Sequence, residues 1–196
     1  MTPPLLIKAP MDDHHGVVQP RFRFPSRTIG LEIWDFSHLE AFAFKVELDL
    51  TPGSLTEVDV IVLFACHCFT RDQAKDEIVS ADLIWNDGHE TRVLDRERYD
   101  LSLIFLPRIV FELQQRRIQI ADPARPNYVT FEIPPGQDRA KPGRYAVFFE
   151  VEKDTQRRKR LLLRIQSAYL LENPTKRLLK GDKINFRVLL KKAYNT

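Results

Sequence analysis

The sequence predicts an α+β protein in which an antiparallel sheet packs against one main helix. The 196-residue chain has 43% hydrophobic and 29% charged residues, which is ordinary for a single globular domain. Its strongest pattern is two apolar runs, Tyr145–Val151 and Leu161–Leu170, around a polar and basic connection. Several strand patterns, one helical stretch and no strand–helix–strand alternation together indicate the α+β class.

The stretch 143–171 predicts a central antiparallel hairpin, because both runs are rich in Val, Phe, Tyr, Leu and Ile and the connection between them is short. Both faces of each strand carry large apolar groups. We therefore expect the hairpin to lie inside a sheet, with at least one further strand beside it and another layer packed on top.

Residues 1–30 contain five prolines and little periodicity, which predicts an extended arm before a single domain over residues 31–196. Arginines alternate with phenylalanines in this arm, at Arg21, Phe22, Arg23, Phe24 and Arg27. The arm either binds nucleic acid or a partner, or its Phe side chains dock onto the domain while the Arg side chains face water.

Alternating apolar residues predict a half-buried strand over 42–50, followed by a turn at Thr51–Ser54. The nearly uncharged run Val58–Phe69 predicts a second, central strand that pairs with the first. A smaller hairpin is expected over 81–94, where two short runs flank the turn residues Asn86–His89.

Apolar residues near helical spacing predict the main helix over Tyr99–Arg117, with Asp100 as its N-cap. Pro107 either kinks this helix or begins a second one. Two further strands are expected, over Tyr128–Ile133 and, from alternating apolar residues, over Lys183–Lys191.

The formal net charge of +3 is divided unevenly, because the stretch from Gln156 to Thr196 holds twelve basic and two acidic residues. A local charge this basic suits a phosphate-rich partner. The alternative is that lysines at strand edges and turns provide solubility and prevent edge pairing.

Several function classes lack their motifs in this sequence. The seven glycines are scattered, and we find no phosphate-binding glycine loop, no nucleophile elbow and no His-Glu-x-x-His pair. Acyl transfer, dinucleotide redox chemistry and nucleoside-triphosphate hydrolysis are therefore disfavoured. Apolar stretches are too short for a membrane helix and the opening lacks a basic secretory region, so we predict no membrane partner and a cytoplasmic location.

The tripeptide Cys66-His67-Cys68 contains residue types that commonly bind metal ions. On a strand, however, the two thiols would point to one face and the imidazole to the other, so they would not share one ion. A disulfide across this spacing would be strained. The pattern therefore predicts two buried cysteines and a hydrogen-bonded histidine, with no metal and no cofactor.

A metal-independent ribonuclease needs a base for the ribose 2′-hydroxyl, an acid for the leaving oxygen and cations for the charged phosphorane. His67 and His89 are the candidate proton carriers, and Ser167 and Tyr169 share one face of a predicted central strand. The candidate phosphate-binding residues are Arg92, Arg98, Arg144 and Arg164. Each of these residues alone also fits a structural or solvated role.

Read in order, residues 90–171 give the arginine-rich ETRVLDRERYDLS, a helix with LPRIVFELQQR, three strands and the ending IQSAYL. This succession resembles the barnase/EndoU/colicin/RelE-type nuclease superfamily, whose members often close with Thr-Ala-Tyr or Ser-Ala-Tyr. WDFSHLEAFAFKVEL and CHCFTRD also look like uncharacterised bacterial proteins with growth-related labels. The resemblance implies that Ser167 and Tyr169 form the terminal motif, that Arg92 or Arg98 is the basic residue before the helix, and that His89 is the upstream histidine.

The resulting hypothesis is a metal-independent endoribonuclease that leaves 2′,3′-cyclic phosphates and acts as a growth-inhibiting toxin or phage-defence effector. Its candidate partners are RNA and an inhibitor or antitoxin protein. The alternative is a non-catalytic module that binds nucleic acid or an acidic protein through the basic C-terminal third. A structural or immunity-type partner protein that uses its Pro-rich arm is the third possibility.

Overall fold

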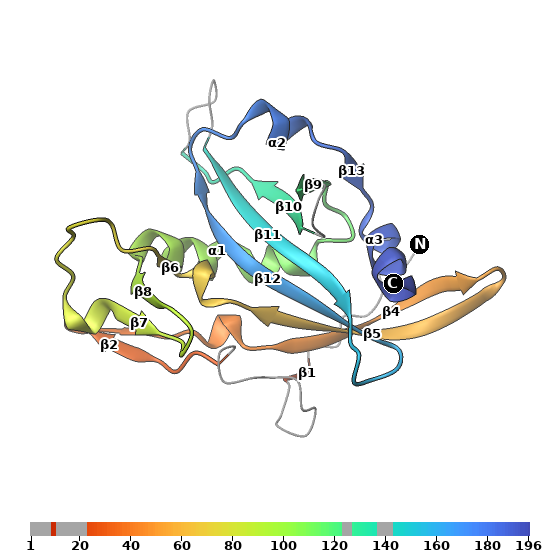
Figure 1. Cartoon of the computed structure of the whole chain (residues 1–196), viewed down its shortest axis with the longest axis horizontal. Helices are drawn as coiled ribbons and strands as arrows, with labels where there is room; N and C mark the ends of the chain where they lie inside the picture. Colours follow the sequence, from red (N-terminus) through yellow and green to blue (C-terminus); the bar gives the residue numbers. More distant parts are fainter. Residues whose placement is uncertain (1–8, 11–22, 123–126, 137–142) are drawn as a thin grey trace.

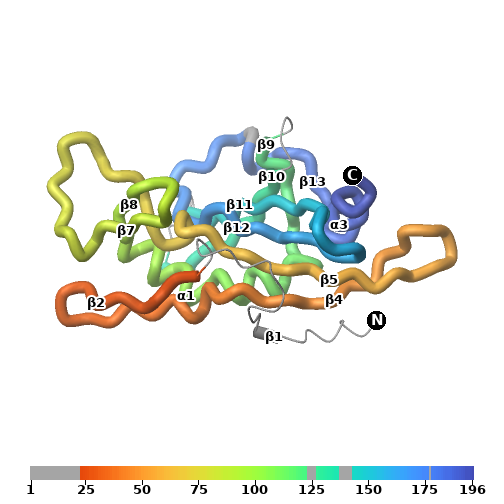
Figure 2. The backbone as a smooth tube through the Cα atoms, turned by 60° about the horizontal axis from the view of Figure 1, so that its bottom comes forward, coloured from red at the N-terminus to blue at the C-terminus, as the bar shows by residue number. Residues whose placement is uncertain are grey.

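In a computed structural model, the chain forms an eight-stranded, mostly antiparallel sheet with helices packed against it and two smaller sheets beside it (Figure 1). The structure describes residues 9–10, 23–122, 127–136 and 143–196. The strand order of the large sheet is β1-β4-β5-β12-β11-β10-β9-β13, and the small sheets are β2-β3 and β6-β8-β7. Figure 2 shows the small sheets at one end of the molecule and α3 toward the other.

The elements have the following bounds. The large sheet contains β1 (Ala9–Pro10), β4 (Phe42–Thr51), β5 (Ser54–Phe64), β9 (Ile118–Asp122), β10 (Asn127–Glu132), β11 (Arg144–Lys153), β12 (Arg160–Leu171) and β13 (Lys183–Ile184). The small sheets contain β2 (Arg27–Ile29), β3 (Glu32–Trp34), β6 (Thr70–Arg71), β7 (Ile84–Asn86) and β8 (Thr91–Leu94). The helices are η3 (Ser37–Leu39), η4 (Cys66–Cys68), η5 (Ala81–Leu83), α1 (Arg96–Phe111), α2 (Lys176–Lys180) and α3 (Phe186–Asn195).

The predicted hairpin is confirmed as β11 and β12, and both strands are interior. β11 lies between β10 and β12, and β12 lies between β11 and β5. The β12–β5 pairing is parallel, whereas every other pairing of described strands is antiparallel. A mixed sheet with one parallel pair was not part of the antiparallel prediction.

The strand predicted over 58–69 is wrong at its end, because β5 stops at Phe64 and residues 66–68 form a 3-10 turn. The amide of Ala65 still donates to the carbonyl of Ile165 at 2.9 Å, and the next amides bond within the turn. Cys68 N–H donates to Ala65 O at 3.1 Å and Phe69 N–H to Cys66 O at 3.0 Å. An apolar run does not distinguish a buried strand from a buried turn, and both cysteines are buried here.

The main helix begins three residues earlier than predicted, with Asp95 rather than Asp100 as its N-cap. The Asp95 carboxylate accepts the amide N–H of Arg98 at 2.9 Å, which satisfies one of the free donors of the first turn. Asp100 instead pairs with Arg96 on the helix surface. Pro107 lies inside one continuous helix, and the residues after 111 turn into β9, a strand that the sequence pattern did not predict.

The strand predicted over Lys183–Lys191 is wrong, because α3 occupies residues 186–195. Its buried residues Phe186, Leu189, Leu190 and Ala193 repeat at helical spacing, and the Asn185 side chain caps its first turn. The alternating pattern had required Val188 to be buried, but 57% of this residue is exposed. Phe186 and Leu190 are apolar in both the helical and the alternating pattern. The short segment Lys183–Lys191 therefore did not distinguish a helix from a strand.

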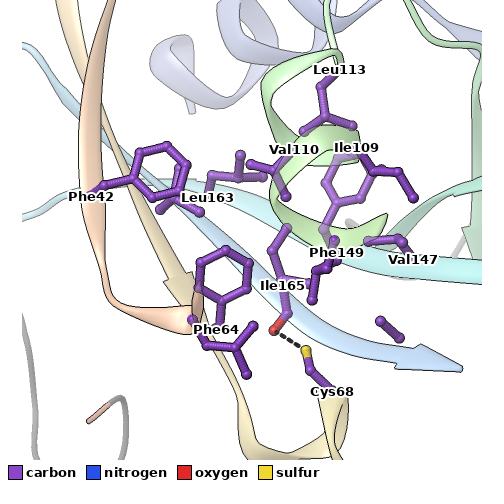
Figure 3. Close-up of a cluster of buried hydrophobic side chains, with 14 of the residues drawn as sticks. Phe42, Phe64, Cys68, Ile109, Val110, Leu113, Val147, Phe149, Leu163 and Ile165 are labelled. Carbon is purple, nitrogen blue, oxygen red and sulfur yellow. Dashed lines mark hydrogen bonds between the residues drawn. The ribbon is translucent and has the colours of Figure 1, made fainter. Parts of the chain in front are cut away.

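The main core lies on the side of the sheet that faces α1 and α3. Figure 3 shows Phe42, Leu163 and Ile165 on the strands, Ile109 and Val110 on α1, and Leu113 just after it, all in one buried cluster. A smaller buried cluster contains Ala41, Ile61, Leu63 and Leu162. Because β5 and β12 contribute to both clusters, their near-continuous apolar sequence is explained by burial on two faces.

The N-terminal residues that the structure describes lie against the domain. Phe24 packs edge-on to Phe69 at 4.9 Å and to Trp85 at 5.8 Å between ring centroids, as predicted for a docked arm. Arg27 was expected to face water, but its guanidinium donates to Ile84 O at 2.6 Å and lies over the Trp85 ring. Arg21 and Phe22 lie outside the described residues.

No helix in the described part of the chain combines the length and the apolar composition that crossing a bilayer requires.

Replacing Val188 by Ala tests the helix at the C-terminus. If residue 188 lies in a helix, Val188→Ala should raise the free energy of unfolding by about 0.5 kcal/mol, because the position is exposed and Ala has the higher helix propensity. In a strand the same change should destabilise the protein, because β-branched residues favour strands. Urea denaturation followed by circular dichroism distinguishes the two signs, and the buried Leu190→Ala should cost about 2–5 kcal/mol as a reference.

Candidate functional site

A pocket of about 450 Å³ opens beside the end of β5 and is lined by three separate segments of the chain. The first is the turn after β5, residues 65–67. The second is the β7–β8 turn, through Asp87, His89 and Glu90. The third is the hairpin, through Glu150 on β11 and residues 164–167 on β12. The pocket therefore exists only because long-range pairing brings these segments together.

The wall formed by β12 contains an irregularity in the sheet. Ile165 pairs with Phe149 while Ser167 pairs with Phe148, so Gln166 is an extra residue between two pairs of partners. Such a bulge bends a strand and re-aims its side chains, and bulges are frequent next to functional sites. Gln166 and Ser167 both line the pocket at this point.

The β7–β8 turn is held by its own side chains. The Asp87 carboxylate accepts the amide N–H of His89 at 2.9 Å and that of Glu90 at 3.0 Å. Gly88 has φ of 88°, the left-handed conformation that this turn requires and that glycine adopts without steric cost. These contacts fix where His89 and Glu90 leave the turn.

His67 and Glu90 form the central polar contact of the site. His67 Nε2 hydrogen bonds to a carboxylate oxygen of Glu90, and the two side chains are 37% and 41% exposed. The second Glu90 oxygen accepts from the Arg92 guanidinium at 3.3 Å. Arg92 is only 5% exposed as a side chain and also donates to Thr70 Oγ1 at 2.8 Å and to Asp72 at 2.6 Å. Arg92 therefore holds the Glu90 carboxylate in place from beneath.

Cys66 lies next to this pair. Its thiol contacts the Asp87 carboxylate, with Sγ and Oδ2 3.7 Å apart, and its carbonyl accepts from the Thr70 hydroxyl at 2.8 Å. Burial, with a further contribution from the charges of Asp87 and Glu90, raises the pKa of the Cys66 thiol from 9.0 to about 12. The thiol is therefore protonated at neutral pH.

The sulfur of Cys66, a ring nitrogen of His67 and a carboxylate oxygen of Glu90 all lie within 4.8 Å of one another. The thiol and the imidazole were expected on opposite faces of a strand. That premise is wrong, because η4 is a tight turn and not a strand. The three groups have the donor types and the proximity that a metal ion needs.

Only some of the predicted catalytic residues line the pocket. His67, His89 and Ser167 line the pocket, together with Arg164. The Arg164 guanidinium also pairs with Glu152 at 2.6 Å. No local spacing brings these residues together, since they lie on three segments far apart in the chain.

Arg98 and Tyr169 lie behind the pocket wall and not in its lining. Arg98 donates to the carbonyl oxygens of His67 at 3.2 Å and Thr70 at 2.6 Å. Its guanidinium lies 4.7 Å from the centre of the Tyr169 ring, which in turn stacks on Phe148. Burial lowers the pKa of Arg98 from its usual value. Both residues therefore support the turn that carries His67.

Arg144 belongs to a different part of the surface. It begins β11, opposite Leu171 at the far end of β12, and lines a second pocket of about 270 Å³ with Arg116, Arg117 and Gln119. The prediction that Arg144 shares a site with His67 thus finds no support in the pocket lining.

The residues that sequence reasoning did not single out are mainly acidic. Asp87, Glu90 and Glu150 line the pocket, so three carboxylates face one arginine there. Acidic residues in turns and at strand ends are common, and only the folded arrangement distinguishes these three. The Asn-Asp-Gly turn signal was the one indication that Asp87 has a defined position.

A family model described as the YjaZ family matches residues 26–194. The chain belongs to the YjaZ family. All the pocket-lining residues lie within the span that matches the YjaZ family model. No curated protein and no solved structure matches the chain.

The raised pKa of Cys66 predicts a specific pH dependence of stability. Above about pH 9 the unfolded chain releases a thiol proton that the folded protein retains, so the folded state loses stability as the pH rises. Between pH 8 and pH 10 this thiol should account for about 1.4 kcal/mol of that loss. Urea denaturation should show a flatter pH dependence for Cys66→Ala than for the wild type by this amount, whereas parallel curves would contradict the assignment.

Proposed function

We propose that this protein cleaves RNA without a metal ion, by acid–base chemistry in the pocket between η4, the β7–β8 turn and β12. The observation that carries the proposal is that His67, His89 and Ser167 line one pocket, although they come from three separate segments. Two imidazoles around one substrate phosphate are the groups that a base and an acid in this reaction require.

The reaction needs a base to take the proton of the ribose 2′-hydroxyl, which then attacks the adjacent phosphorus. It also needs an acid to protonate the leaving 5′-oxygen, and the product is a 2′,3′-cyclic phosphate. An ionised Glu90 accepts a hydrogen bond from His67 Nε2–H, which leaves Nδ1 as the proton acceptor. His67 is accordingly assigned as the base and His89 as the acid.

Positive charge for the phosphate comes from Arg164 at the pocket and from a basic surface beyond it. We define the basic surface as the exposed residues Lys153, Arg157, Arg158, Lys159, Lys191 and Lys192, at the hairpin tip and on α3. Lys153 contacts the Tyr194 ring at 5.2 Å, so the tip and α3 are neighbours. Five residues of extended chain separate Lys159 from Arg164, or about 17 Å, which a few nucleotides span.

Two of the three pocket carboxylates are engaged by neighbouring groups. Glu90 is paired with both His67 and Arg92, and the Asp87 carboxylate is hydrogen bonded to turn amides and to Cys66. His89 as the acid would carry its proton beside the bound phosphate, and His67 would gain a positive charge only when it takes the 2′-hydroxyl proton. Arg164 and the two histidines would contact a single phosphodiester, and the basic surface provides the remaining contacts to the RNA.

We further propose that this activity inhibits growth from within the cytoplasm, where a protein inhibitor would have to cover the pocket. Both cysteines are free and buried, which fits a reducing compartment.

Purified protein should cleave RNA in excess chelator and leave 2′,3′-cyclic phosphate ends. His67→Gln and His89→Gln should each lower the rate by about 10²–10⁴-fold, because each removes a proton-transfer group. His38→Gln is the matched control, because His38 bonds to Ser102 Oγ on α1 and does not line the pocket. Gel analysis of labelled RNA, with circular dichroism to confirm folding, measures the effect.

The proposal fails if folded wild-type protein cleaves no RNA, with ribosome-bound message and tRNA included among the substrates. It also fails if cleavage persists at the wild-type rate in both His67→Gln and His89→Gln, since that activity would come from a contaminant or another site.

The second candidate function is non-catalytic binding of nucleic acid through the basic surface. The observation that favours it is the exposure of Arg157, Arg158 and Lys159 at the hairpin tip. Arg160, from the same basic run, cannot contribute, because its side chain is 7% exposed and pairs with the buried Asp154. This candidate predicts association without turnover.

Arg157→Gln/Arg158→Gln should weaken RNA binding and lower the slope of log affinity against log salt by roughly 1.4, since about 0.7 counterion is released per single-strand phosphate contact. The control is Lys75→Gln/Arg117→Gln, which removes the same charge from exposed positions outside the basic surface. Equal salt slopes in the two double variants would show that the hairpin tip does not contact RNA. Fluorescence anisotropy of labelled RNA gives both slopes.

A further inference from the structure

We propose that Cys66, His67 and Glu90 form a zinc-binding site at the edge of the pocket. The sulfur, ring nitrogen and carboxylate oxygen of these residues already lie within 4.8 Å of one another. They come from two segments, η4 and the β7–β8 turn, that meet only in the folded protein. Binding of an ion would therefore join these segments.

The separations are close to what a tetrahedral ion requires. Zinc bond lengths of about 2.0–2.3 Å place neighbouring ligand atoms roughly 3.5 Å apart. His67 and Glu90 are each partly exposed, so rotation of these two side chains can open their mutual hydrogen bond and admit an ion between them and the buried Cys66. The adjoining pocket leaves room for water as a fourth ligand.

The donor set and the local charge favour zinc over other common cations. A sulfur, an imidazole nitrogen and a single carboxylate oxygen suit a borderline-soft ion, whereas magnesium and calcium prefer oxygen ligands throughout. Next to Cys66, the carboxylates of Asp87 and Glu90 supply negative charge that favours a cation at this edge of the pocket. Arg92 fixes the second oxygen of Glu90, the kind of outer contact that orients a metal ligand.

A bound ion would occupy groups that the proposed reaction needs. Zinc on His67 Nε2 would displace the hydrogen bond to Glu90 and prevent the imidazole from acting as a base. Zinc should therefore inhibit RNA cleavage reversibly, and this consequence alone rests on the proposed function. The site itself does not, because binding is measured without RNA.

The test is titration of the reduced, metal-free full-length protein with Co²⁺, followed by displacement with Zn²⁺. One equivalent should bind, displace the Cys66 thiol proton to solvent, and give a thiolate-to-cobalt charge-transfer band that Zn²⁺ removes. Cys66→Ser should abolish this band. His67→Gln and Glu90→Gln should weaken zinc binding by at least about 100-fold, since loss of outer contacts alone costs roughly 10–100-fold.

Two matched controls locate the site. Cys68→Ser should keep the charge-transfer band, because the Cys68 sulfur is directed to the Ile165 carbonyl, 3.9 Å away, and is not part of the cluster. Glu57→Gln should keep full affinity, because Glu57 pairs with Lys45 on the β4–β5 hairpin. Thermal unfolding confirms that each variant is folded. If a cysteine variant does not fold, the zinc affinities of His67→Gln and Glu90→Gln still test the site, because both residues are partly exposed.

The zinc site is overturned if no stoichiometric ion binds, or if folded Cys66→Ser keeps the band. It is also overturned if His67→Gln and Glu90→Gln bind zinc as tightly as the wild type. Stoichiometric binding in a protein that cleaves no RNA supports the site and counts against the proposed ribonuclease. Chelator-resistant cleavage without zinc binding supports the ribonuclease and counts against the site.

Discussion

The parallel pairing of β5 with β12 is the constraint on which the pocket depends. Six consecutive residue pairs, from Asp59 with Arg160 to Phe64 with Ile165, fix the register of the two strands. β5 ends at that point while β12 continues to Leu171, so the chain that leaves β5 must turn beside residues 165–167. The Cys66–Cys68 turn is therefore placed next to the β12 bulge by sheet register, although about 100 residues separate the two segments.

A cluster of aromatic rings gives the other wall of the pocket its position. Phe69 and Trp85 pack with centroids 5.0 Å apart, and Phe36 lies 4.4 Å from Phe69. These contacts anchor β6 and β7 beside η4, and the β7–β8 turn then carries Glu90 to His67. The Glu90 contact with Arg92 extends the connection into the small sheet. The polar groups of the site therefore rest on the large sheet and on the β6-β8-β7 sheet, which share one hydrophobic core.

The strand over 42–50 could be predicted from its alternating residues, which do not fit helical spacing. The hairpin strands could be predicted from two long apolar runs rich in strand-forming residues and joined by a short polar connection. The errors came where a pattern was short or uniformly apolar. Residues 66–68 are as buried in a turn as they would be in a strand, and Phe186 and Leu190 fit either period. Long-range parallel pairing leaves no local signal, so the β5–β12 contact was not predictable.

The same limit explains which parts of the candidate site were predicted. His67, His89 and Ser167 were chosen by residue type, and the fold places them around one pocket. Arg144 was chosen by the same reasoning, but the antiparallel hairpin carries it opposite Leu171 and into another pocket. Cys66 and Glu90 acquire their significance only from their distance to His67, which no spacing in the sequence reports.

The central claim is that a substrate phosphate binds between His67 and His89. Its most direct test is a titration of the protein with a 3′-nucleoside monophosphate, followed by nuclear magnetic resonance of the histidine ring protons. The chain contains five histidines, so single His→Gln variants assign the signals. The expected result is saturable shifts of the His67 and His89 signals with the His38 signal unmoved. Saturable binding that leaves both pocket histidines unshifted would contradict it.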